Sequence, residues 1–179
     1  MATIFDVANY FLAFQDSEQD ITHLKLQKLC AYAQAICVSL LDRPLFMENL
    51  IIRSDGVISP DLFQQYAKFG DLPLPSSNLS EESAREPFDD ECKFIIDLVH
   101  AYYARYAGWY LSNRAKCDFP EKLGLNGIID LTDLKEAFKN DPLVVRFRDE
   151  LPDKLSKIDF ETIERNLVDE SCVLQALNV

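Results

Sequence analysis

Residues 21–34 read ITHLKLQKLCAYAQ, and this stretch predicts the helix around which the rest of the chain packs. Thr22 can accept a hydrogen bond from a free amide of the first turn, as an N-cap. Ile21, just outside the cap, suits a hydrophobic staple. No formally charged residue occurs in 29–41. A helix without charge on any face is typically surrounded by protein, so we expect a buried central helix that runs to about Asp42.

Shorter elements are expected on either side of this helix. Apolar spacing predicts an amphipathic helix from Thr3 to Phe14. Arg43-Pro44 should end the central helix, because proline disfavours a helical residue before it. The order that follows is a short β-hairpin, with runs 50–52 and 57–58 around the turn dipeptide Asp55-Gly56, and then a helix from Asp61 to Phe69 that Pro60 begins and Gly70 stops.

The second half of the chain begins after an acidic segment, 71–90, which is rich in proline and serine and predicts a linker. Aromatic residues at three- and four-residue spacing then predict one long helix over 91–113. Further helices are predicted over 131–139, 143–151 and 160–177, with Asp141 as a cap. The prediction is a mainly α protein: a compact helical N-terminal half (1–70) with a central buried helix and one short hairpin, the linker, and a helical C-terminal half (91–179) packed on the first.

Composition limits the classes of function. Lys and Arg total 18 against 30 Asp and Glu, a net charge of −12 that would repel nucleic acid and anionic membranes. The longest nearly uncharged run is too short for a membrane span. The five cysteines form an odd count without paired spacing, which fits reduced thiols. We therefore expect a cytoplasmic protein that binds neither nucleic acid nor membrane directly.

Residues for catalysis or cofactor binding are sparse. The chain has two histidines and lacks CxxC, HxxxH and HExxH motifs and glycine-rich phosphate loops. Cys30 and Cys37 would lie about 10 Å apart along one helix, too far to share a zinc ion. We expect no metal, no cofactor and no enzymatic activity.

The stretch 21–34 resembles the signature of the Panacea domain family, in which a helix opens with T-x-L-K-L-Q-K-L and continues into an aromatic-A-Q run. Two shorter matches follow in the family's order: RPLF at 43–46 and GVISPDLF at 56–63. The sequence departs from the family pattern at Ala31, Arg53 and Val57. The motif positions that we expect to serve the fold are Thr22, Leu24, Leu26, Leu29, Gly56 and Pro60.

This resemblance, which covers residues 4–69, implies a mode of action. The family includes SocA-like antitoxins and phage-associated proteins, which neutralise a toxin by direct binding and in some cases present it to a protease. It therefore implies a non-catalytic, protein-binding module with a cognate toxin as its partner. The alternative is a stand-alone structural or regulatory protein of the same fold that self-associates and has no toxin partner.

Two groups of residues are candidates for partner contact. The first lies on the motif helix: Lys25, Gln27, Lys28 and Tyr32. The alternative for this group is that buried hydrogen bonds fix the hairpin or the next helix onto the central one. The second group lies on the aromatic helix and has the composition of an interface hot spot: Tyr102, Arg105, Tyr106 and Trp109. Its alternative is core packing between the two halves.

Overall fold

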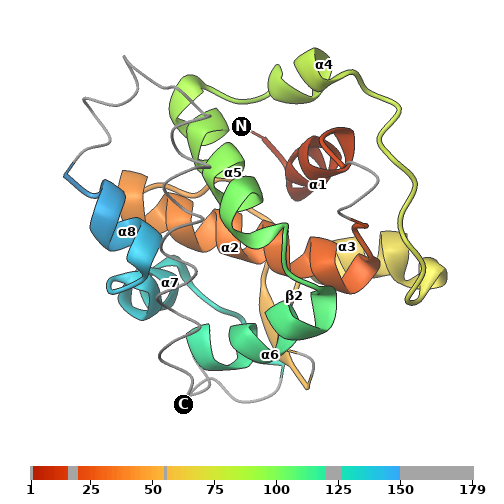
Figure 1. Cartoon of the computed structure of the whole chain (residues 1–179). Coiled ribbons are helices and arrows are strands. Elements are labelled where there is room, and N and C mark those ends of the chain that lie inside the picture. The colour runs from red at the N-terminus through yellow and green to blue at the C-terminus, as the bar shows by residue number, and fades with distance from the viewer. Residues whose placement is uncertain (1, 16–19, 55, 120–125, 150–179) are drawn as a thin grey trace.

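The computed structural model describes residues 2–15, 20–54, 56–119 and 126–149, and these form a mainly helical fold with one two-stranded sheet (Figure 1). The elements in chain order are α1 (Ile4–Ala13), α2 (His23–Leu41), β1 (Ile51–Arg53), β2 (Gly56–Ile58), α3 (Pro60–Tyr66), the 3-10 helix η1 (Ala67–Phe69), α4 (Glu81–Arg85), α5 (Asp90–Tyr103), α6 (Gly108–Asp118), α7 (Leu131–Phe138) and α8 (Pro142–Phe147). The predicted fold class is confirmed.

Helix α2 is the centre of the structure, and it crosses the middle of Figure 1 with α1 and α5 above it and α6 and α7 below. Thr22 caps its start by accepting from the Lys25 amide at 3.3 Å, as predicted. Asp42 ends it in the left-handed conformation. All of its residues from Lys25 to Val38 are buried. The prediction of a central buried helix, with these limits, is confirmed.

The hairpin packs its second strand inward. Strands β1 and β2 are antiparallel with Ile52 opposite Val57, and every residue of β2 is buried. The outer edge of β1 is paired as well, since the Ile52 amide donates to the Gly127 carbonyl and the Ile52 carbonyl accepts from the Asn126 amide. The later chain therefore closes the edge that a two-stranded sheet would leave open.

The C-terminal half corrects one prediction. The single helix expected over 91–113 is two helices, because the chain turns between Tyr103, the last residue of α5, and Gly108, the first of α6. A Cβ atom on Gly108 would lie 3.1 Å from the Thr22 hydroxyl oxygen, so glycine lets α6 approach the start of α2 closely. The turn allows both helices to pack on α2. Asp141 caps α8 as predicted, accepting from the Leu143 amide at 2.9 Å, and the helix predicted over 160–177 lies outside the described residues.

The acidic segment 71–90 is packed against the rest of the chain. Its Leu74 amide donates to the Ile21 carbonyl at 2.8 Å, and its Ser77 amide donates to the Leu12 carbonyl at 3.2 Å. Helix α4, within the segment, lies against α1. Side chains before and after the segment join one continuous hydrophobic core, to which it adds Leu74 and Phe88.

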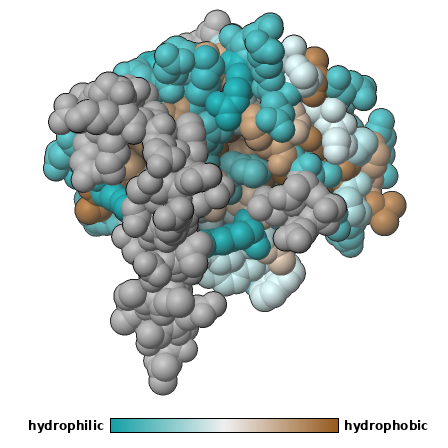
Figure 2. Space-filling model, turned by 45° about the horizontal axis from the view of Figure 1, so that its top comes forward, coloured by the Kyte–Doolittle hydropathy of each residue, from teal (hydrophilic) through white to brown (hydrophobic). Residues whose placement is uncertain are grey.

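The face of the molecule in Figure 2 carries both hydrophilic and hydrophobic residues. Figure 2 brings the top of Figure 1 forward and shows hydrophobic residues as patches between hydrophilic ones. No helix in the described part of the chain is long and apolar enough to cross a membrane.

Gly56, which opens β2, should be difficult to replace. Its φ of +88° lies where side chains cause strain, and a Cβ atom would also lie 3.4 Å from the Ser112 carbonyl oxygen. We expect Gly56→Ala to lower the free energy of unfolding by about 2 kcal/mol, measured by urea denaturation. Ser54→Ala, at an exposed position of the same hairpin, should change it by less than about 0.5 kcal/mol. Equal stability of the two variants would contradict this account.

Candidate functional site

The polar residues of the motif helix hold neighbouring segments in place. The Gln27 side chain is buried and forms two hydrogen bonds with Ser59, between β2 and α3: its carbonyl accepts from the Ser59 amide at 2.8 Å, and its nitrogen donates to the Ser59 carbonyl at 3.2 Å. Lys28 is also buried, and its ammonium donates to the Val57 carbonyl in β2 at 2.8 Å. These two side chains fix the hairpin and the start of α3 onto α2.

Two further residues of α2 do the same for other segments. Tyr32 donates to the Asp118 carboxylate at the end of α6 at 2.7 Å and stacks on Tyr103, with ring centroids 4.1 Å apart. Burial, followed by the nearby Asp118 charge, raises the pKa of Tyr32 well above its ordinary value. Gln34 accepts from the Leu45 amide at 2.8 Å and donates to the Phe46 carbonyl at 2.9 Å, which fixes the loop after α2.

The predicted partner-contact surface on α2 therefore needs correction. Lys25, Gln27, Lys28 and Tyr32 are all buried, and of the four only Gln27 reaches the lining of a groove. The alternative interpretation, that such residues fix the hairpin and the next helix through buried hydrogen bonds, describes the observed contacts of Gln27 and Lys28. Sequence reasoning missed Gln34, although it stands in the quoted motif.

The other motif positions also serve the fold. Leu26 and Leu29 are fully buried. Pro60 occupies the first turn of α3, where its fixed φ is tolerated, and Ser59 before it caps the helix. Leu24 differs, because it is partly exposed and lines a groove.

The aromatic candidates divide between core and surface. Tyr102 is buried at the end of α5. The Arg105 guanidinium lies over the rings of Tyr102 and Tyr106, 5.2 Å and 5.1 Å from their centroids. Trp109, in the first turn of α6, is 67% exposed. The structure thus leaves Trp109 as the most accessible member of this group, while Tyr102 packs in the core.

A groove opens beside the first turn of α2, with a cavity volume of about 850 Å³. Its walls come from the start of α2, the hairpin of β1 and β2, helix α3 with the adjoining η1, the residues after η1 and the middle of α6. The buried side chains of Gln27 and Ser112 belong to its lining. The same hydrogen bonds that fix α3 on α2 therefore shape this groove.

Three large exposed apolar side chains belong to the segments that form the groove, and we call them the rim: Phe63, which lines the groove, and Leu72 and Trp109, each close in sequence to a lining residue. Phe63 lines the groove and packs on His23, with ring centroids 5.4 Å apart. Leu72 lies between Asp71, which lines the groove, and Pro73, which pairs with Thr22. Trp109 lies three residues before Ser112, on the same side of α6.

Much of each rim side chain lies in solvent. Phe63 is 50% exposed, Leu72 68% and Trp109 67%. A single exposed apolar residue is common, whereas several around one concave site mark an interaction surface. Sequence reasoning identified Trp109 and missed Phe63 and Leu72, because three separate segments bring these residues together.

His23 is the titratable group at the inner wall of the groove. The Gln27 side-chain nitrogen lies 3.0 Å from its Nε2. Because the Gln27 oxygen already accepts from Ser59, its nitrogen is the donor and the His23 Nε2 is the acceptor. Burial, followed by the nearby Lys28 charge, lowers the pKa of His23 from 6.5. His23 is therefore neutral in the groove at pH 7.

The described residues contain no group of three or more His, Cys, Asp or Glu side chains placed to hold a metal ion. The groove itself presents one exposed cation, Arg53, and one exposed anion, Asp71, on a mainly apolar lining. This arrangement suits binding of a partner surface that is apolar with a few polar groups.

Removing the Gln27 amide should destabilise the fold. In Gln27→Leu the Ser59 amide would lose its acceptor in a buried position, so we expect the free energy of unfolding to fall by about 2 kcal/mol. Gln65→Leu, at an exposed position of α3, is the matched control and should change it by less than about 0.5 kcal/mol. Urea denaturation of both variants measures the difference. If Gln27→Leu has the free energy of unfolding of the native chain, the contact with Ser59 does not contribute to stability.

The lowered pKa of His23 predicts a pH dependence. The unfolded chain binds the proton more tightly than the folded chain, so stability should be fully present above pH 6.5 and fall as the pH drops toward the folded pKa. His23→Gln can still accept from Gln27 but does not titrate. We therefore expect the free energy of unfolding of the native chain, relative to this variant, to decrease between about pH 8 and pH 5. A constant difference across this range would contradict a neutral His23.

Comparison of the chain with protein-family models, with curated proteins and with solved structures gives no match. What the groove binds is therefore inferred from the groove's own residues.

Proposed function

We propose that this chain is a non-catalytic, Panacea-like binding module that holds a cognate protein in the groove at the start of α2. The observation that carries this proposal is the half-exposed Phe63 in the lining of the groove, with exposed Leu72 and Trp109 close in sequence to the lining residues Asp71 and Ser112. Aromatic anchors at the edge of a concave site are typical of interaction hot spots.

The rigidity of the site supports a binding role. Helix α3, which carries Phe63, is fixed at its start by the Gln27–Ser59 hydrogen bonds. Helix α6, which carries Trp109, is fixed at its end by Tyr32 and Asp118. A surface that is already ordered loses little conformational entropy when a partner binds. The motif residues thus contribute to binding indirectly, by holding the rim in position.

The nature of the partner follows from the resemblance and the charge. The resemblance implies a cognate toxin that the protein neutralises or delivers to a protease. With a net charge of −12, the chain would attract a basic protein at long range and raise its association rate. Toxins that act on nucleic acid are commonly basic at their working surface, so a toxin of this class is the partner we propose.

A second candidate function is self-association. The exposure of Trp109, at 67%, favours it, because two copies of the chain could bury their rims against each other. In this case the protein would be a stand-alone structural or regulatory protein that has no toxin partner.

The test is affinity capture with the tagged full-length protein, followed by reconstitution of each captured protein with the purified chain. We expect Phe63→Ala/Trp109→Ala to weaken the dissociation constant at least about tenfold, because both anchors lose their contact area. Expression of the captured partner alone should arrest cell growth, and co-expression of this chain should relieve the arrest.

Phe5→Ala/Val145→Ala is the matched control, since both residues are exposed and neither lines the groove. This variant should bind as the native chain does. Equal loss in both variants, or no loss in either, would count against the groove. If sedimentation shows a homodimer that the rim variant dissociates, and no other protein is captured, the self-association function replaces the toxin-binding one.

A further inference from the structure

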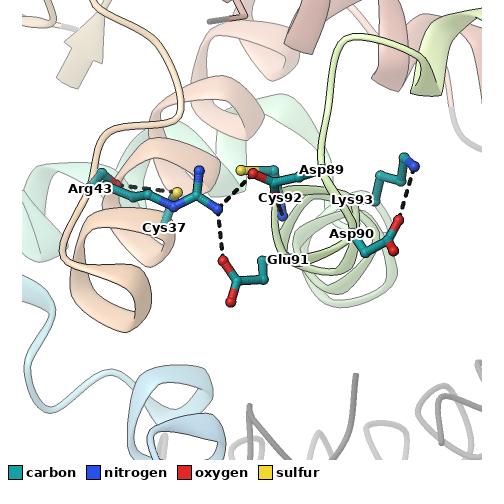
Figure 3. A network of polar contacts seen from close by, with 7 residues as sticks. All are labelled: Cys37, Arg43, Asp89, Asp90, Glu91, Cys92 and Lys93. Atoms are coloured by element: carbon teal, nitrogen blue, oxygen red, sulfur yellow. Dashed lines mark hydrogen bonds and ion pairs between the residues drawn. The ribbon is translucent and has the colours of Figure 1, made fainter. Parts of the chain in front are cut away.

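Two buried thiols from distant parts of the sequence meet at the other end of α2. Cys37 lies one turn before the end of α2, and Cys92 lies in the first turn of α5 (Figure 3). The Cys37 thiol donates to the Arg43 carbonyl at 3.4 Å. In Figure 3 the Cys92 sulfur points toward the Cys37 sulfur. Contact with Cys92, together with burial, raises the pKa of Cys37 well above its ordinary value.

A network of charges holds the two helices at this position. The Arg43 guanidinium donates to the carboxylates of Asp89 and Glu91, both at 2.8 Å (Figure 3). Asp89 in turn caps α5 by accepting from the Cys92 backbone amide at 2.9 Å. The turn after α2 and the first turn of α5 are therefore tied together, and the two thiols are kept against each other.

The pair differs from the other described cysteines in its surroundings. Cys30 is fully buried on α2, seven residues from Cys37 and about 10 Å away along the helix axis. Cys117 is exposed on α6. Cys92 is 6% exposed, and the side chains of Asp89 and Glu91 beside it are 54% and 45% exposed. Cys37 is fully buried, so Cys92 is the member of the pair that has some contact with solvent.

We propose that Cys37 and Cys92 form an oxidisable dithiol site that hydrogen peroxide converts into an intramolecular disulfide. In the first step the Cys92 sulfur attacks one peroxide oxygen, the O–O bond breaks, and hydroxide leaves and takes the thiol proton as water. Cys92 is then a sulfenic acid. In the second step the Cys37 sulfur attacks the Cys92 sulfur, the S–O bond breaks, and hydroxide leaves with the Cys37 proton as a second water. Two thiols lose two hydrogen atoms, and one peroxide becomes two waters.

The disulfide would join the end of α2 to the start of α5. It would close a loop over residues 37–92, which carries the hairpin, α3, η1 and α4. A cross-link across a long loop stabilises a fold by restricting the unfolded chain. The oxidised protein should therefore unfold less readily than the reduced protein, and this inference does not depend on which partner the groove binds.

The test titrates the reduced full-length protein with hydrogen peroxide in native buffer, blocks remaining thiols by alkylation, and maps the disulfide by peptide mass spectrometry. We expect a Cys37–Cys92 linkage, a loss of two hydrogen atoms in the intact mass, and a rise in Tm of about 5 °C or more. Dithiothreitol should reverse all three changes.

Variants locate the site. Cys117→Ser/Cys172→Ser leaves Cys30, Cys37 and Cys92 as the cysteines of the chain and should behave as the native protein does. In this background Cys30→Ala should still form the linkage, whereas Cys92→Ala should lose both the linkage and the rise in Tm. Three outcomes would overturn the proposal. The disulfide could map to Cys30, or it could form only in urea. Cys92 could also be oxidised irreversibly while Cys37 remains a free thiol that is still alkylated.

Discussion

The structure depends on a constraint imposed by α2, a helix that is buried along most of its length and yet carries polar side chains. A buried amide or ammonium group costs free energy unless it is paired. Gln27, Lys28 and Gln34 meet this requirement by bonding to the backbone of Ser59, Val57 and the loop at Leu45 and Phe46. Because a backbone group sits at one place in its segment, each pairing fixes both the position and the register of that segment. Apolar contacts alone would leave such short elements free to slip.

This arrangement separates the residues that build the site from those that can contact a partner. Most motif side chains are buried, with Leu24 and Gln27 at the wall of the groove, whereas the large exposed apolar side chains nearby are Phe63, Leu72 and Trp109. The rim residues can vary without loss of the fold, since their side chains are largely in solvent. A fixed interior with a variable rim is a physical means by which one kind of domain could bind unrelated proteins. Under the proposed function, the motif would specify the scaffold and the rim would select the partner.

Local signals in the sequence were sufficient to predict most of the helices and the hairpin. Thr22 and Asp141 act as caps, strands β1 and β2 form the predicted hairpin, and most of the uncharged run of α2 is buried. The division of the aromatic helix was missed because Tyr106 and Trp109 continue the helical spacing of α5, and the close approach of Gly108 to Thr22 is a tertiary contact. The groove, its rim and the Cys37–Cys92 contact were missed for the same reason: each joins residues from segments far apart in the sequence. The burial of Lys28 also depends on tertiary structure, because no local feature of the sequence indicates that a lysine will donate to a strand carbonyl.

The two ends of α2 are linked through the chain between them. Its first turn lines the groove, and its last turn carries Cys37 beside Arg43 and the start of α5. The loop that joins these ends, residues 37–92, includes both the hairpin and α3, so any constraint placed on the loop acts on two walls of the groove. A rigid groove loses less conformational entropy when a partner binds, but it fits fewer shapes of partner. A disulfide between Cys37 and Cys92 would close this loop, so its stabilising effect would extend to the chain segments that form two walls of the groove.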